Sequence, residues 1–259
     1  MRFVQHRSVP MVSGYSSGYI LQFTVTRLFD YAAWVHRAQQ FVLALEGRRG
    51  FTVASSDVSP PLVRTQVDAL ARRLDQPLPG AFRLFLKSGA AALHCRYTFE
   101  HDSDDRAAAE AFHDLFPTQS HIYGGACVGP ANELPSFAQS CAEWAKVFLT
   151  AHDTDKADEW EEALPVTAIA NGDYIALDGT TARDPDDPPV LYLSHDGENV
   201  QLADSFTAFL TTWERLCYLG PEIWLLDRFR DDDGLLDLDS RAVDQLRQLL
   251  GLPNVECER

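Results

Sequence analysis

The fold is decided by one stretch, LPVTAIANGDYIALDGTTARDPDDPPVLYLSHDGENVQLADSFTAFLTTW, which runs from Leu164 to Trp213. It contains three short runs rich in Val, Ile, Leu and Tyr, bounded by Gly, Pro, Asn and Asp, as is typical of β-strands. These runs are residues 166–170, 174–177 and 190–193. Asn171 and Gly172 separate the first two runs, and because both residue types tolerate positive φ, we predict a type I′ hairpin there.

The same stretch ends in an amphipathic helix. Asp204 or Ser205 is suited to cap its N-terminus. Apolar residues then recur at intervals of three and four and form one stripe: Phe206, Phe209, Leu210, Trp213 and Leu216. We therefore expect a mostly antiparallel sheet with helices packed on it, an α+β fold. These residues account for a fold and nominate no catalytic group.

Length and composition favour a protein that folds without disulfide bonds or structural metal ions. The chain has 259 residues, 46% of them hydrophobic, which suffices for a full core. Its first residues, MRFVQHR, are polar and charged where a signal peptide needs an apolar run, and no apolar stretch reaches the length of a membrane span. We therefore expect a soluble, cytoplasmic protein. Its five cysteines are scattered and odd in number, which indicates reduced thiols.

The net charge of −16 is concentrated in the second half of the chain. Residues 1–116 hold 13 Lys and Arg and 11 Asp and Glu, whereas residues 117–259 hold 9 and 27. Such a field repels nucleic acid and anionic membranes and attracts basic partners. Two acidic clusters in expected loops are therefore predicted to face a partner, unless acidity serves solubility alone. They are Asp184, Asp186 and Asp187, and Asp231, Asp232 and Asp233.

Upstream of the central stretch, alternating apolar residues predict a strand over residues 19–26, and a helix follows that Asp30 caps and Gly47 ends. Ser59, followed by two prolines, predicts the cap of a second helix. The buried face of that helix is expected to comprise Val63, Val67, Leu70 and Leu74. A short helix over residues 81–87 comes next.

Further elements are expected on both sides of the central stretch. A strand is marked by alternation from Leu93 to Phe99, and a weak strand lies near Gly124. Helices are expected through Phe112, over residues 136–150, over residues 221–230 and after a cap at Ser240. The helix at 136–150 should carry Phe137, Cys141, Trp144 and Phe148 on one face. The expected organisation is a strand–helix extension (1–54), a core (55–219) and a helical extension (220–259), together one compact unit.

Two segments carry a family resemblance. Residues 60–86 combine a capped helix, the run LDQPLP and the apolar run FRLFL; residues 164–219 combine LPV, an NGD hairpin, an HDG loop and LADSF before the covering helix. Over about residues 55–219 the chain resembles the SMI1/KNR4 family of the SUKH superfamily. It departs from the family pattern at Ala71, where a glutamate is common, at Phe82, where a tyrosine is common, and at Ser88-Gly89, where Asn-Gly-Gly is common.

The resemblance implies an α+β fold and no catalytic or cofactor residues. Bacterial members are regarded largely as immunity proteins that neutralise polymorphic toxins, many of them nucleases, and fungal members as regulatory interaction proteins. We therefore expect a protein that occludes a basic toxin domain by protein–protein contact. A regulatory scaffold of the same fold is the alternative. Oligomeric state is left open.

The sequence gives weaker support to catalytic and metal-binding functions. Residues 14–18 match the G-x-S-x-G nucleophile elbow, which makes a hydrolase using Ser16 a remote alternative, but an expected strand follows where an elbow needs a helix. The acidic run at 231–234 lacks the oxygens of a calcium loop, and the His and Cys residues lack zinc spacing. His195 and Asp196 lie in an expected turn with no nucleophile nominated beside them.

Overall fold

The computed structural model describes residues 29–101, 106–149, 154–179, 184–237 and 241–252. By internal contacts, the described residues from Tyr31 onward form one compact unit. The strand predicted over residues 19–26, Ser16 and the predicted cap Ser240 lie outside the described residues.

The first sheet is antiparallel and is built around a central strand. It comprises β1 (Phe51–Ser59), β2 (Ala92–Phe99), β3 (Ile122–Gly124) and β4 (Cys127–Val128), with the order β1-β2-β3 and β4 also paired to β2. The alternation predicted for β2 is confirmed, since Leu93, Cys95, Tyr97 and Phe99 are buried and His94 is exposed. Gly125 separates β3 from β4 with φ +122°, where a Cβ would lie 1.8 Å from the carbonyl oxygen of Cys95.

The second sheet is the predicted meander with one strand more. Its strands are β5 (Leu164–Ala168), β6 (Tyr174–Leu177), β7 (Val190–Leu193) and β8 (Val200–Ala203), antiparallel in the order β5-β6-β7-β8. The prediction missed β8. The neighbouring strands β4 and β5 join the two sheets, because Gly129 N–H donates to the Val166 carbonyl and the Thr167 hydroxyl donates to the Cys127 carbonyl.

The turn between β5 and β6 differs from the predicted type I′ turn. Only Gly172 has positive φ (+100°); Asn171 does not. Gly172 N–H donates to the Ile169 carbonyl at 3.0 Å and Ile169 N–H donates to the Asp173 carbonyl at 2.9 Å, which defines a three-residue loop ending in a left-handed glycine. The Asn171 side chain, which contacts Asp173 twice, makes this longer loop favourable.

The covering helix is confirmed. Helix α7 (Phe206–Arg215) begins after Ser205, whose hydroxyl accepts a hydrogen bond from Ala208 N–H, and its whole predicted stripe is buried. Helix α1 (Tyr31–Leu43) packs beside it, because Trp34 Nε1 donates to the Leu210 carbonyl and the rings of Tyr31 and Phe206 stack. Buried aromatic residues therefore fix α1 against α7.

The second helix begins later than predicted. Ser59 is the last residue of β1, and α2 (Arg64–Ala71) starts after Val63. A residue before proline is restricted to extended backbone, so Ser59 continues the strand instead of capping a helix. Val63 is 61% exposed, not buried as predicted, whereas Val67, Leu70 and Leu74 are buried. The short helix is confirmed as α3 (Gly80–Leu84), continued by the π-helical turn η1 (Phe85–Gly89).

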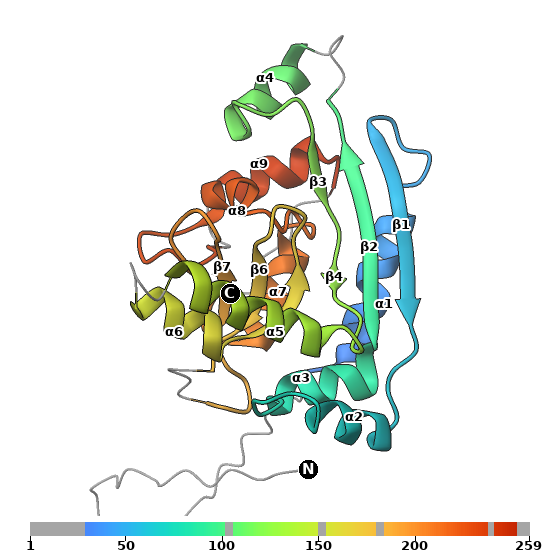
Figure 1. The fold of residues 1–259 in the computed structure, drawn as a ribbon. Coiled ribbons are helices and arrows are strands. Elements are labelled where there is room, and N and C mark those ends of the chain that lie inside the picture. Colours follow the sequence, from blue (N-terminus) through green and yellow to red (C-terminus); the bar gives the residue numbers. More distant parts are fainter. Residues whose placement is uncertain (1–28, 102–105, 150–153, 180–183, 238–240, 253–259) are drawn as a thin grey trace, which may run out of the picture. The chain divides into compact units, whose positions relative to one another are not determined.

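Two helices cover one face of the second sheet, and α7 lies behind it in the view of Figure 1. Helix α5 (Leu134–Trp144) continues into the π-helical turn η2 (Ala145–Leu149), and α6 (Thr154–Glu162) follows. Cys141, Ala145, Leu149 and Trp160 pack on β6 and β7. The wider π turn changes which side chains face the sheet, so Ala145 and Leu149 are buried while Phe148, predicted to share a face with the buried Cys141, is 54% exposed.

The remaining elements are helices outside the two sheets. Helix α4 (Arg106–Leu115) packs with α9 (Arg241–Leu249), and α8 (Ile223–Leu226) continues into the 3-10 turn η3 (Asp227–Phe229). The Arg228 guanidinium donates to the Asp114 carbonyl. Antiparallel sheets with helices packed on them confirm the predicted α+β class.

Candidate functional site

The predicted acidic residues of the 184–187 cluster have different roles in the structure. Asp184 and Asp186 are exposed, and Asp184 accepts a hydrogen bond from Asp186 N–H at 3.0 Å. Asp187 is half-buried, and its carboxylate accepts bonds from the Thr207 N–H and the Thr207 hydroxyl at the start of α7. The charge of Asp187 therefore holds the covering helix, whereas Asp184 and Asp186 present theirs to solvent.

The 231–233 cluster lies in a tight turn after η3. Asp231 accepts hydrogen bonds from the backbone N–H groups of Asp233 and Leu235, at 3.0 and 2.9 Å. Asp232 and Asp233 are exposed, as is Asp231. The two clusters have separate surroundings, because the first contacts α3 and α7 and the second turns back on its own segment. Contact of either cluster with a partner stays a prediction.

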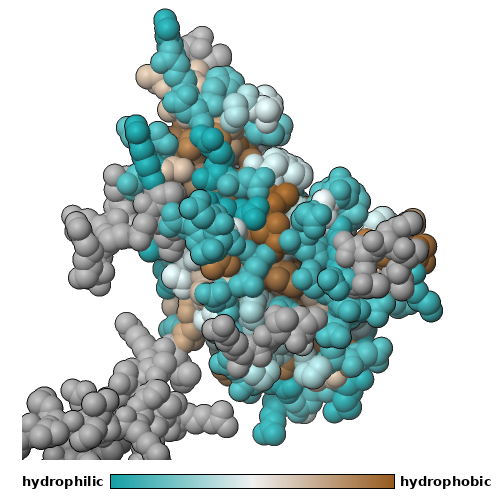
Figure 2. Space-filling model, turned by 90° about the vertical axis from the view of Figure 1, so that its left-hand side faces the viewer, coloured by the Kyte–Doolittle hydropathy of each residue, from teal (hydrophilic) through white to brown (hydrophobic). Residues whose placement is uncertain are grey.

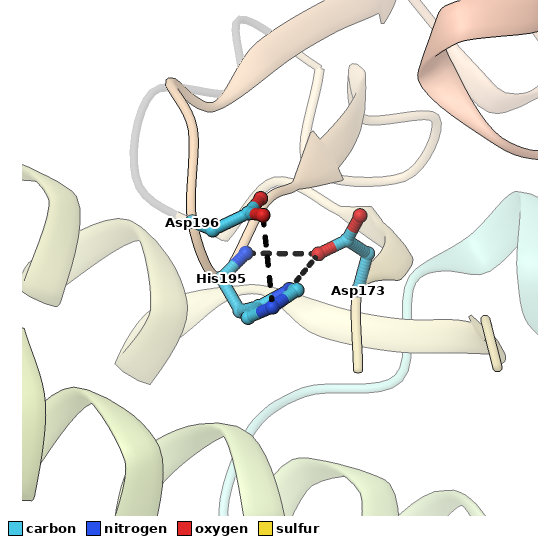
Figure 3. A group of neighbouring side chains, drawn as sticks. All are labelled: Asp173, His195 and Asp196. Carbon is cyan, nitrogen blue, oxygen red and sulfur yellow. Dashed lines mark hydrogen bonds and ion pairs between the residues drawn. The ribbon is translucent and has the colours of Figure 1, made fainter. Parts of the chain in front are cut away.

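A third group, which the sequence did not single out as a site, gathers around Asp173. Asp173 directly precedes β6 and is 2% exposed, and β7 brings Tyr192 and the following His195 to it. His195 Nδ1 lies 2.6 Å from Asp173 Oδ1, and Asp196 Oδ2 lies 3.9 Å from His195 Nε2 (Figure 3). The loop residues after β7 thereby bind to the turn before β6.

The Asp173 carboxylate accepts hydrogen bonds on both oxygens. Oδ1 receives the His195 N–H at 2.9 Å as well as the imidazole, and Oδ2 receives the Tyr192 hydroxyl at 2.5 Å and the Asn171 amide at 2.6 Å. Burial alone raises the pKa of Asp173, but these donors stabilise the charged form and hold its pKa below the usual value of 3.8. Asp173 is therefore ionised at neutral pH.

This group resembles a metal site, because Asp173, His195 and Asp196 each offer one ligand atom and these atoms lie within 4.8 Å of one another. A carboxylate offers about four lone-pair sites, and all four on Asp173 are used by protein donors. The neighbouring Ser194 hydroxyl donates to Asp196 and accepts from Gly197 N–H, so it is not presented to the imidazole as a nucleophile. The geometry makes Asp173 a structural link between the turn before β6 and the end of β7.

A thiol and an imidazole also meet on the first sheet. Cys127 Sγ lies 3.9 Å from His94 Nδ1. Burial raises the pKa of Cys127 to about 11, with only partial compensation from Arg96, so the group is a thiol at neutral pH. Because the thiolate is the nucleophile, this pair lacks the property that cysteine catalysis needs.

Glu222 is a buried acid without a complete set of partners. It is 5% exposed, and among the described residues its Oε2 has no hydrogen-bond partner. Burial raises its pKa, the charge of Asp173 adds to this, and Arg96 and the residue's own backbone N–H oppose it. Glu222 therefore destabilises the folded state whenever it is charged.

The surface combines polar faces with local apolar exposure. The face in Figure 2 is mostly hydrophilic, with apolar residues in a narrow band. On η2, Val147 is 68% and Phe148 54% exposed, and the Phe148 ring stacks on Trp144 with centroids 4.1 Å apart. Aromatic side chains held in this way are common anchors in protein interfaces.

The structure also has a groove of about 860 Å³. Its walls are α5 and η2, the end of α6, the segment 73–79, and the two ends of the loop between β6 and β7. Gln76 Nε2 donates to the Ala163 carbonyl at 3.1 Å and ties two of these walls together. Sequence reasoning missed the groove, because its walls come from four separate segments.

The described residues place antiparallel sheets under helices and present a groove and exposed acidic clusters. None of the helices in the described ranges has the length and apolarity needed to cross a bilayer. The model of the SMI1 / KNR4 family (SUKH-1) matches residues 61–212. The chain belongs to this family, as the resemblance implied. A search of the curated proteins found no match.

Proposed function

We propose that this chain is a cytoplasmic immunity protein that binds a cognate toxin domain and neutralises it by protein–protein contact. The family membership over residues 61–212 is the observation that carries the proposal. The charge adds to it, because residues 117–259 hold 27 acidic against 9 basic residues and would attract a basic domain such as a nuclease.

The site geometry is consistent with a binding role. Within the described residues, the Asp173 carboxylate accepts hydrogen bonds from Asn171, Tyr192 and His195, and Cys127 remains protonated at neutral pH. By contrast, Asp184, Asp186 and the 231–233 cluster present charge to solvent without supporting the core. Such a surface steers a partner into encounter without taking part in chemistry.

The test begins with a search of the genes that flank the gene for this chain for a toxin domain, followed by co-expression of the chain with that domain. We expect cells that produce both proteins to survive and cells that produce the toxin alone to die. An unrelated toxin domain of similar charge serves as the control and should not be neutralised. Death of cells that contain both proteins, together with binding to a host regulator, would replace the immunity function with that of a regulatory scaffold.

A further inference from the structure

The groove between α5 and the segment 73–79 is held open by the fold. The Gln76 side chain bonds the end of α6, and Gly179 lies so close to that end that a Cβ would be 2.3 Å from the Glu162 carbonyl oxygen. Its volume of about 860 Å³ falls within the range of ligand pockets. It can hold a short extended segment but not a folded domain.

The charge on the walls is unbalanced. Five carboxylates line the groove, against the cations Arg73 and Lys146. Three of these carboxylates, on Asp75, Glu161 and Glu162, are exposed and form no ion pair with any described residue. An excess of negative charge on the walls of one groove favours a cationic occupant over a neutral or anionic one.

The apolar part of the lining also selects the occupant. Five of the lining residues are prolines: Pro77, Pro79, Pro135, Pro185 and Pro188. A proline offers a carbonyl acceptor and a rigid apolar ring but no N–H donor. A wall of this kind suits a ligand rich in donors, and arginine and lysine side chains carry donors only.

We propose that this groove receives an extended arginine- or lysine-rich segment of the partner protein, whose cationic side chains pair with Asp75, Glu161 and Glu162. The inference rests on the proposed function, since it names the contact through which the partner is held. A second copy of this chain is a poor occupant, because it carries the same net charge of −16.

The test uses the full chain and a defined probe, an end-blocked octapeptide of alternating arginine and glycine. We expect backbone NMR shifts at residues 73–79, 139–146 and 161–164. A peptide with glutamine in place of arginine should produce no such shifts. The triple variant Asp75→Asn/Glu161→Gln/Glu162→Gln should bind the arginine peptide about tenfold more weakly. Each exposed ion pair contributes only part of the binding free energy, so all three carboxylates are replaced together.

The matched control is Asp231→Asn/Asp232→Asn/Asp233→Asn, which removes the same number of charges away from the groove. It should change the dissociation constant of the peptide by less than about twofold. Equal weakening in both triple variants, or shifts that avoid the groove, would overturn the inference.

A second arm separates this inference from the proposed function. If the toxin domain binds the wild type and the groove variant equally, the groove is not the contact, although the immunity function stands. If the toxin does not bind the wild type, the immunity function fails, and the peptide shifts alone decide whether the groove takes a basic segment. Weaker toxin binding by the groove variant than by the 231–233 variant supports both.

Discussion

Replacing Asp173 with Asn tests whether the fold depends on the carboxylate that links β6 to β7. Asp173 accepts four hydrogen bonds, two on each oxygen. An asparagine keeps one oxygen and turns an NH2 group toward two of the donors. Hydrogen bonds to charged groups contribute roughly 1.5–3 kcal/mol each, and removal of the buried charge offsets part of the loss. We therefore expect Asp173→Asn to lower the free energy of unfolding by about 3 kcal/mol at neutral pH.

The assay is urea unfolding followed by tryptophan fluorescence. Asp196→Asn is the matched control, because the Asp196 side chain is 76% exposed and lies 3.9 Å from the same imidazole. It should change the free energy of unfolding by less than about 0.5 kcal/mol. Equal effects of the two substitutions would refute the assignment of Asp173 as the link.

The pH dependence gives a second readout. The pKa of Asp173 is lower in the folded state than its usual value of 3.8, so its contribution is fully present above that value. The contribution is lost as pH falls through the folded-state pKa. The difference in stability between wild type and Asp173→Asn should therefore shrink below about pH 4. A constant difference over this range would contradict the role of the charge.

Four further predictions concern stability, catalysis and association. Gly172→Val should lower the free energy of unfolding by about 1–3 kcal/mol, because φ is positive there, and an unchanged urea midpoint would contradict this. Glu222→Gln should stabilise the protein by on the order of 1 kcal/mol at neutral pH. The raised pKa of Glu222 means that this gain vanishes in thermal melts as pH falls below 4.5, where the wild-type acid is protonated in both states. Ser16→Ala should leave toxin neutralisation intact. If the purified protein hydrolysed esters and this substitution abolished that activity, the proposed binding function would be wrong. Replacing the exposed acids of the 184–187 cluster, or those of the 231–233 cluster, with Asn should slow toxin association in stopped-flow experiments, most at low salt. The dissociation rate and the melting temperature should remain nearly unchanged. If the association rate depends on neither salt nor these substitutions, the acidic surface serves solubility and does not steer the partner.

Strongly patterned elements could be predicted from the sequence. Helix α7 carries a complete apolar stripe and a serine cap, and β2 alternates without interruption, so local preference and burial agree. Elements without such patterns were missed. Strand β1 has the small polar sequence FTVASSDVS, and α6 is mostly charged, with Ala157 and Trp160 as its buried anchors. Their structure depends on pairing and packing that a local pattern does not encode.

At two places a local irregularity in the backbone changes which side chains are buried or brought together. The π turn at 145–149 fits more residues into one turn at the end of α5 than an α-helix does, and here Phe148 is exposed and Leu149 buried. The hairpin contains one residue more than a type I′ turn, and this places Asp173 where Tyr192 and His195 reach it. Neither the Asp173 link nor the groove could be predicted, because both are assembled from distant segments by strand register and helix packing.

The most direct test of the immunity function is a titration of the purified toxin domain's own activity with the purified chain. We predict that activity falls linearly to zero and reaches it at a stoichiometric amount of the chain, as expected for a tight protein complex. Unrelated toxin domains should remain active under the same conditions. Full toxin activity in the presence of excess chain would contradict the proposal that this protein neutralises its partner by binding it.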